Sequence, residues 1–531
     1  MRKGARRGLW VAAILLLIVG AVVFQRLTRA TPYVRDQVVS TLNSRFASQV
    51  ELDLLEVSVF PRPEILGEGL NLRHNGRTDV PPLVTVPSFS ATAGLFGLTA
   101  KPLRLNTVTL DGLEIRIPAG GINGGTPQEK GPSQAAGITA PPPTNHPASH
   151  GRPANVLVDL MVAKTAALEI ASKDPTKLPR RFDIQNLEMN GLGEADGTPF
   201  KAALTNPKPR GRIDTEGRFG PWHTDDPRQT PIRGDYLFGS ANLDTIKGIG
   251  GTLSSAGEYK GVLERIEVTG HTETPDFVID IAGQPMPLTT TFSAVVDGTN
   301  GNTWLERVEA TLRKTTIVAR GAVVRAVDVK GRHIALDVAI DAGRLEDLLA
   351  LAVHSARPPM TGAVMLKTHL VIPAGEEDVV DKLQLAGEFQ LAEARFTNLD
   401  VQRRVNALSR KGQGDEASGN EGESAVSNLR GRFALRDGTI RFSNLTFAVP
   451  GAIVQLAGIY NLRNEAIDFG GHLLLDATLA EMTTGIKSVV ARIAQPLFRR
   501  PGGGSKLPIR ISGTRSNPAF GLDVKRALTP G

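Results

Sequence analysis

Residues 429–475, LRGRFALRDGTIRFSNLTFAVPGAIVQLAGIYNLRNEAIDFGGHLLL, decide the fold. Short apolar or alternating runs are separated by residues that tolerate the positive backbone dihedral angles of tight reversals, which is typical of β-hairpins. The expected turns or breaks are at Asp437-Gly438, Asn444, Pro450-Gly451, Asn464-Glu465 and Gly470-Gly471. The stretch is therefore predicted to form an antiparallel meander. It carries no catalytic residues in a recognisable spacing, so its function is expected to depend on the surface of the sheet.

Period-two alternation recurs through the rest of the chain, and it predicts strands with one apolar and one polar face. In residues 382–396, for example, Leu385 and Phe389 share one face, whereas Glu388 belongs to the other. The fold class is therefore mainly β. The side chains expected on the apolar face are Leu336, Val338, Leu383, Leu385, Phe389, Leu391, Phe442 and Phe447.

Composition excludes several function classes. The 531 residues include no cysteine, which rules out disulfides, Cys-ligated metals and thiol nucleophiles. The net charge of +7 is confined to the N-terminus, because seven Lys and Arg residues precede the first acidic residue, Asp36. The remainder is neutral and only 5% of residues are aromatic, so no nucleic-acid partner is expected.

The N-terminus is predicted to anchor the chain in a membrane. Residues 9–24, LWVAAILLLIVGAVVF, are uncharged and follow the basic segment MRKGARR. A transmembrane helix over 9–26 is expected, with residues 1–8 cytoplasmic and most of the chain periplasmic, as a single-pass inner-membrane protein. The alternative is a cleaved signal peptide, for which Thr28-Arg29-Ala30 is a poor cleavage site. Candidate anchor residues are Leu9, Trp10, Leu16 and Phe24.

Helices are predicted at four further places. Thr31-Pro32 begins a helix whose apolar residues Val34, Val38, Leu42 and Phe46 lie four apart, and it is expected to pack on the start of the sheet rather than on a membrane surface. Short helices are expected at 345–355 and 400–410. Residues 479–498 are predicted to form an amphipathic helix, expected to cap the sheet or to contact the outer membrane or a partner. Its apolar positions include Leu479, Ile486, Val490, Ile493 and Leu497.

Composition also divides the chain into regions. Residues 119–155 are rich in Gly, Pro, Ser and Ala, and residues 411–427 are rich in small and charged residues, so both are predicted to be disordered inserts. The expected organisation is a helix with the first strands over 31–118, a central β-region over 156–410 and a C-terminal β-region over 428–531.

Motifs for catalysis or metal binding were sought and not found. The nine histidines form no HExxH, and the two that lie close together, His146 and His150, fall in the predicted insert 119–155, where a chance spacing is the better account. GxSxG, Walker A and GxGxxG motifs are absent. Acid pairs such as Asp225-Asp226 and Glu376-Glu377 lie among loop residues, where solvated charge is commoner than acid-base catalysis. The chain is therefore not expected to be an enzyme or to hold a cofactor or metal. The alternative, an envelope hydrolase, requires carboxylates that converge from distant strands.

The order of these parts resembles the AsmA family of bacterial envelope proteins. The similarity extends over the anchor and TPYVRDQVVSTLNSRFASQVELDLLEVSVFPRPEI, over TETPDFVIDIAG and TTFSAVVDGTNGNTWLERVEATLRKTTIVARG, and over residues 429–475 with LPIRISGTRSNPAF. The resemblance implies a long, bent antiparallel sheet that forms an open hydrophobic groove, as in bridge-like, chorein-type lipid-transfer proteins. It also implies phospholipid transfer between the inner and outer membranes and a role in outer-membrane biogenesis.

Two alternatives remain at this point. The apolar faces could fill a closed β-core, or the protein could be a scaffold or regulator of outer-membrane protein assembly. Roughly 25 strands spaced about 4.8 Å apart would give a groove on the order of 100 Å long.

Overall fold

The structure is a computed structural model of the 531-residue chain. It describes residues 32, 34–40, 42–43, 48–58, 63–74, 78–94, 100–117, 140, 156–170, 179–194, 197–223, 226–246, 248–279, 284–326, 329, 331–352, 357–375, 377, 379–414, 425–477, 503–514 and 517–522.

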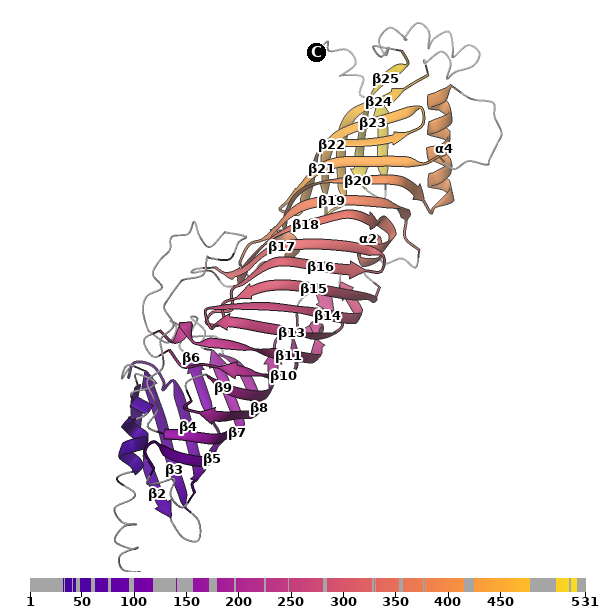
Figure 1. Ribbon diagram of the computed structural model, residues 1–531. Helices are drawn as coiled ribbons and strands as arrows, with labels where there is room; N and C mark the ends of the chain where they lie inside the picture. The colour runs from indigo at the N-terminus through magenta and orange to yellow at the C-terminus, as the bar shows by residue number, and fades with distance from the viewer. Residues whose placement is uncertain are drawn as a thin grey trace, which may run out of the picture.

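The described strands form one long, bent sheet (Figure 1), and their number, 26, is close to the roughly 25 expected. The strands are β1 Ser48–Glu51, β2 Leu54–Ser58, β3 Glu64–His74, β4 Val84–Thr92, β5 Leu103–Asp111, β6 Glu114–Ile117, β7 Val156–Ile170, β8 Arg180–Leu192, β9 Thr198–Pro207, β10 Arg210–Phe219, β11 Pro231–Asn242, β12 Ile249–Gly250, β13 Thr252–Val262, β14 Arg265–Ile279, β15 Met286–Val296, β16 Thr303–Leu312, β17 Thr315–Arg325, β18 Arg332–Arg344, β19 Met360–Ile372, β20 Gln384–Phe396, β21 Ser427–Arg436, β22 Thr439–Val449, β23 Ala452–Asn461, β24 Ala466–Leu475, β25 Ser505–Thr514 and β26 Pro518–Leu522. The helices with complete bounds are α2 Leu345–Ala352, α3 Val379–Lys382 and α4 Leu399–Gln413, with 3-10 turns η2 Pro227–Gln229 and η3 Leu243–Thr245.

The C-terminal meander has the tight turns that the sequence predicts. Asp437 and Gly438 form the two-residue loop between β21 and β22 with φ angles of 51° and 69°, the positive values that such hairpins need. Pro450 and Gly451 separate β22 from β23, and Gly451 has a φ of 79°. These turn predictions are confirmed.

Two predicted breaks in the meander are wrong. Asn444 lies inside β22, where a bulge between Phe442 and Leu445 takes up the extra residue without ending the strand. Gly471 lies inside β24, where a Cβ atom would come within 1.9 Å of the carbonyl oxygen of Gln455. This glycine accommodates a close approach of two strands and not a turn.

The expected antiparallel sheet is in fact mixed. Strand β7 pairs in parallel with β5 and β6, whereas all other pairs of described strands are antiparallel. Parallel neighbours need a long crossover connection, and residues 118–155, which join β6 to β7, supply it. The sheet therefore continues past the predicted insert, but the strands on either side of it, β6 and β7, run in the same direction.

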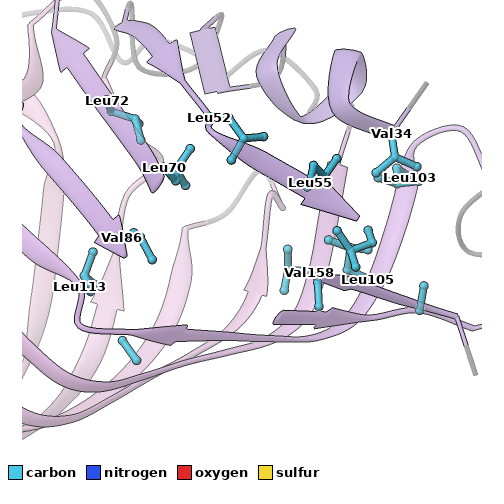
Figure 2. Close-up of a cluster of buried hydrophobic side chains, with 14 of the residues drawn as sticks. Val34, Leu52, Leu55, Leu70, Leu72, Val86, Leu103, Leu105, Leu113 and Val158 are labelled. Atoms are coloured by element: carbon cyan, nitrogen blue, oxygen red, sulfur yellow. The ribbon is translucent and has the colours of Figure 1, made fainter. Parts of the chain in front are cut away.

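A buried hydrophobic core closes the N-terminal end of the sheet. Val34 is 1% exposed and packs with leucines from several strands, among them Leu55 and Leu105 (Figure 2). Val38 and Leu42 from the same predicted stripe pack against this cluster, and Phe46 lies outside the described residues. The prediction that this helix packs on the start of the sheet is confirmed.

Helices α2 and α4 lie along one side of the sheet (Figure 1), and each covers a small buried cluster. Leu345 of α2 packs with Val364 of β19, and Val405 of α4 packs with Val449 of β22. Asn398 caps α4 by accepting hydrogen bonds from the amides of Asp400 and Val401. Helix α4 extends to Gln413, three residues into the range predicted as the second insert.

Several predictions fall on residues that the structure does not describe. They are the anchor over 9–26, all of the first insert except residue 140, most of the second insert and the amphipathic helix over 479–498. Among the residues that are described, no helix has the length and apolar character needed to cross a membrane.

Candidate functional site: the apolar face

One row of directly paired residues crosses the sheet from β2 to β25 without a charged side chain. We call it the apolar row, and the face of the sheet that carries it the apolar face. The row consists of Val57, Ile65, Ala91, Val108, Met161, Met189, Phe200, Gly217, Gly234, Tyr259, Val268, Ala294, Leu305, Gly321, Leu336, Leu370, Leu385, Leu435, Ile440, Tyr460, Ile467 and Gly513. Because side chains alternate between faces along each strand, the register places the apolar sets of separate strands on the same side.

The register brings seven of the eight predicted residues of this face together. Leu336 and Leu385 belong to the apolar row. The other five are Val338, Phe389, Leu391, Phe442 and Phe447, which lie an even number of positions from the row on their strands or are aligned by the bulge in β22. Leu383 precedes β20, so the strand register does not assign it to a face.

The bulge at Asn444 decides the position of the two phenylalanines of β22. Phe442 and Phe447 are five residues apart, and strict alternation would place them on opposite faces. Phe442 pairs with Phe433 and Phe447 with Leu429, both residues of the apolar face, because the bulge shifts the register between them. Both therefore belong to the apolar face.

These residues differ in how far they are covered. Leu391 is 7% exposed and packs with Leu345 of α2. Phe447 packs against the buried cluster that α4 covers. Leu336, Leu385 and Phe442 are half-buried and belong to none of the buried clusters. The central residues of the face are thus covered only in part by the described chain.

Aromatic rings on this face lie across glycines of neighbouring strands. A Cβ atom at Gly431 would lie 3.1 Å from Cε1 of Phe389, and one at Gly458 would lie 2.8 Å from Cδ1 of Phe469. The ring centroids of Phe389 and Phe433 are 6.1 Å apart, a usual distance for paired aromatic residues. The sequence reasoning missed Phe433, Phe469 and these glycines, because the pairing becomes visible only when the register is known.

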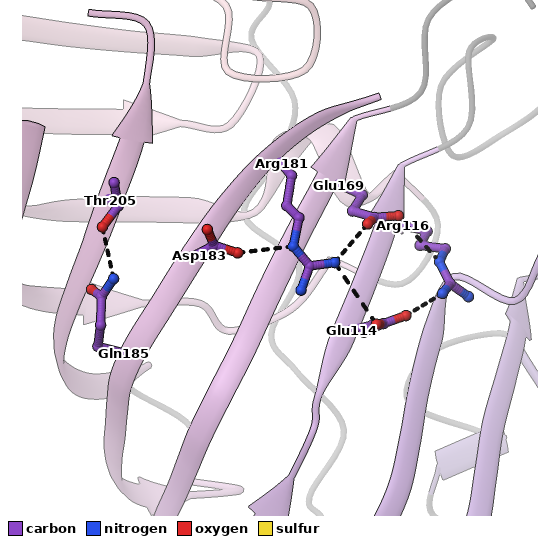
Figure 3. A network of polar contacts seen from close by, with 7 residues as sticks. All are labelled: Glu114, Arg116, Glu169, Arg181, Asp183, Gln185 and Thr205. Carbon is purple, nitrogen blue, oxygen red and sulfur yellow. Dashed lines mark hydrogen bonds and ion pairs between the residues drawn. The ribbon is translucent and has the colours of Figure 1, made fainter. Parts of the chain in front are cut away.

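The opposite face is charged. Asp337 receives a 2.8 Å contact from Nδ1 of His369 and lies 3.5 Å from Nε of Arg320. Arg181 joins Glu169 at 2.8 Å and Asp183 at 2.8 Å in a network across β6, β7 and β8 (Figure 3). Its hydrogen bonds to Asp183 and Glu169 raise the pKa of Arg181. Exposed pairs of this kind contribute about 0–1 kcal/mol each, so they chiefly keep this face soluble.

Two shallow cavities of about 850 and 770 Å³ lie mostly between charged residues of this opposite face. The first is bordered by residues such as Lys201, Glu216 and Arg233, and the second by residues such as Asp337 and Glu388. Neither has the enclosed, mainly apolar character typical of a small-molecule site.

Asp226 and Asp297, two acidic residues that lie outside the strands, are held by structural contacts. Burial disfavours the charged form of Asp226, but its hydrogen bonds to Arg228 and the charge of that guanidinium prevail and lower the pKa of Asp226. Asp297 accepts bonds from the amide and hydroxyl of Thr299 and from the side chain of Asn300 within one turn. Within the described ranges, no three His, Asp or Glu residues are grouped as a metal site would require.

Comparisons with known proteins found no similarity from which to assign a family. No protein-family model matches the chain, and no curated protein or solved structure matches it. The inference about function therefore rests on the geometry of the apolar face and on the sequence.

Proposed function

We propose that this chain is a non-enzymatic carrier of phospholipid, with acyl chains held against the apolar face. In this proposal an N-terminal helix anchors it in the inner membrane, and the periplasmic sheet carries lipid between the inner and outer membranes in support of outer-membrane biogenesis. Lipid headgroups face water and the acyl chains slide along the sheet, so no cofactor or catalytic group is needed.

The observation that carries the proposal is the uncharged apolar row. An apolar sheet face ordinarily packs against a second layer of helices or strands. Here every described strand belongs to a single sheet, and α2 and α4 cover only small clusters on the face. Half-buried leucines such as Leu336 and Leu385 therefore remain partly open, and acyl chains have the chemistry to complete their burial.

The dimensions of the sheet also favour a conduit. Strands about 4.8 Å apart give the 26-stranded sheet a length on the order of 100 Å, long enough for many lipids. The buried core at the N-terminal end fills the face near Leu55, so the proposed open stretch extends from β9 to β25. The resemblance to the AsmA family, with its inner-membrane anchor and groove, agrees with this function.

Native mass spectrometry of the full-length chain extracted from membranes tests the proposal. We expect several phospholipids bound to each chain, because the proposed stretch is many acyl chains long. A protein that is consistently free of lipid, and takes up none from phospholipid vesicles, would contradict the proposal and favour the alternative of a protein-binding scaffold.

A further inference from the structure

The apolar face changes character in the middle of the sheet. Across β10 to β15 it carries a group of hydroxyl side chains that we call the hydroxyl patch, which consists of Thr215, Tyr236, Ser255, Tyr259, Thr272 and Thr290. The residues of β17 and β18 that the register aligns with the patch are apolar, namely Ile317, Ala319, Leu336 and Val338. Acyl chains therefore meet one polar segment within a largely hydrocarbon surface.

The two tyrosines of the patch are held by defined hydrogen bonds. The hydroxyl of Tyr259 lies 2.8 Å from Oγ1 of Thr215, and the hydroxyl of Tyr236 lies 3.1 Å from Oγ of Ser255. Burial raises the pKa of Tyr259, so its phenol is protonated at neutral pH. The patch is thus an ordered arrangement of neutral hydroxyl groups.

Counting hydrogens shows which atom donates in each pair. A hydroxyl group has one hydrogen. Thr215 donates its hydrogen to the carbonyl oxygen of Asp235 at 2.7 Å, and Ser255 donates its hydrogen to the carbonyl oxygen of His271 at 2.9 Å. Tyr259 must therefore donate to Thr215, and Tyr236 to Ser255. Each phenol has used its hydrogen and keeps lone pairs that can accept.

Glycines make room for both phenol oxygens. A Cβ atom at Gly234 would lie 2.7 Å from the hydroxyl oxygen of Tyr259, and one at Gly270 would lie 2.7 Å from that of Tyr236. Any larger residue would displace the phenols. Both tyrosines are only half-buried, so each side chain is partly accessible from the apolar face.

We propose that the hydroxyl patch binds the hydrogen-bond-donating part of a lipid, a primary ammonium or a hydroxyl group, through the phenol oxygens of Tyr236 and Tyr259. This inference rests on the proposed lipid-carrying function and adds a selectivity to it. At the patch, unlike elsewhere along the sheet, a lipid turns its headgroup from water to the sheet, with the donor on the phenols and the acyl chains along the apolar residues of β16 to β20. A quaternary ammonium headgroup has no N–H to donate and is held less well.

The test compares phosphatidylethanolamine with phosphatidylcholine of identical acyl chains. Full-length protein is incubated with vesicles that contain the two lipids in equal amounts, and the bound lipids are quantified by mass spectrometry. One additional hydrogen bond from a charged ammonium favours the donor lipid about tenfold or more. We expect an enrichment of this order in the wild type and its loss in the Tyr236→Phe/Tyr259→Phe double variant.

Tyr460→Phe is the matched control, because Tyr460 lies on the same face but outside the patch. It should keep the enrichment. The double variant preserves both rings over their glycines, and an unchanged thermal unfolding curve will show that it folds. Equal uptake of the two lipids by the wild type, or undiminished enrichment in the double variant, would overturn the proposed headgroup binding by the hydroxyl patch. Either result would leave the proposed carrier function intact. Failure to take up either lipid would overturn both.

Discussion

The rings of Phe442 and Phe469 contact each other across an intervening strand, with centroids 5.8 Å apart. Phe442 lies on β22 and Phe469 on β24, and Gly458 of β23 is the residue paired with both. Two strands separated by a third are about 9.6 Å apart, so the rings meet by reaching over the glycine. The two rings thus lie along the sheet, and the described residues leave both of them half-buried.

Replacing Gly458 should destabilise the sheet. In Gly458→Val the new Cβ atom would lie 2.8 Å from the ring of Phe469 and 2.2 Å from the carbonyl oxygen of Asp468, so strand or ring must move. We expect a loss of about 1–3 kcal/mol in the free energy of unfolding, measured by urea denaturation. Gly239→Ala is the control, because nothing lies within 4 Å of the added atom. Equal stability of Gly458→Val and wild type would show that the rings are not packed as described.

Adjacent residues of β20 should respond differently to a charge. Leu385 lies on the apolar face, whereas Ala386 lies on the opposite face and is exposed. Leu385→Asp should reduce the phospholipid bound per chain severalfold, because a carboxylate disfavours contact with acyl chains. Ala386→Asp should leave binding unchanged. Equal lipid binding by the two variants, both shown to be folded by circular dichroism, would argue against contact between lipid and this face.

The attachment of α2 should depend on a buried threonine. Thr315 is fully buried, donates to Oδ2 of Asp347 at 2.9 Å and accepts from the amide of Arg344 at 2.9 Å. Thr315→Val removes a bond to a buried carboxylate and should cost about 1–3 kcal/mol of unfolding free energy. Thr316→Val, at an exposed position, should change stability little. If the denaturation curves of Thr315→Val and Thr316→Val coincide, this account of the attachment of α2 is contradicted.

The pH dependence of stability should include a contribution from Asp297. Burial, with a smaller effect of the nearby Glu264 charge, raises the pKa of Asp297 despite its hydrogen bonds to Thr299 and Asn300. The folded state then holds a proton that the unfolded state, with a pKa of about 3.9, has lost. Stability is consequently lost as pH rises from the unfolded value through the raised folded value. The free energy of unfolding, measured across this pH range, should show that loss in the wild type and not in Asp297→Asn. Identical slopes of the unfolding free energy against pH in the two proteins would refute this account.

The sequence predicts local features well where residue types close together in the chain decide them, as in a tight turn or a helical stripe. Asp437-Gly438 reverses the chain because both residues adopt positive φ angles, and the helical stripe that begins at Val34 packs as its spacing indicates. Asn444 and Gly471 mislead because the same residue types that make turns also make bulges and close strand approaches.

Long-range pairing explains the remaining differences. The parallel alignment of β7 with β5 pairs strands that are far apart in the sequence, and no local pattern encodes it. The apolar face could be predicted strand by strand, as for Leu336 and Leu385, but its continuity follows only from the register. The glycines beneath Phe469 and Tyr236 are recognisable only once neighbouring strands are paired.

Photocrosslinking in membranes tests the central claim most directly. A photoreactive amino acid is placed at Leu336 on the apolar face or at the adjacent Asp337 on the opposite face, in the full-length chain, and lipid adducts are quantified by mass spectrometry. The account predicts phospholipid adducts at position 336 and few at position 337. Equal adducts at the two positions, or none at 336, would contradict the proposal that the apolar face carries lipid.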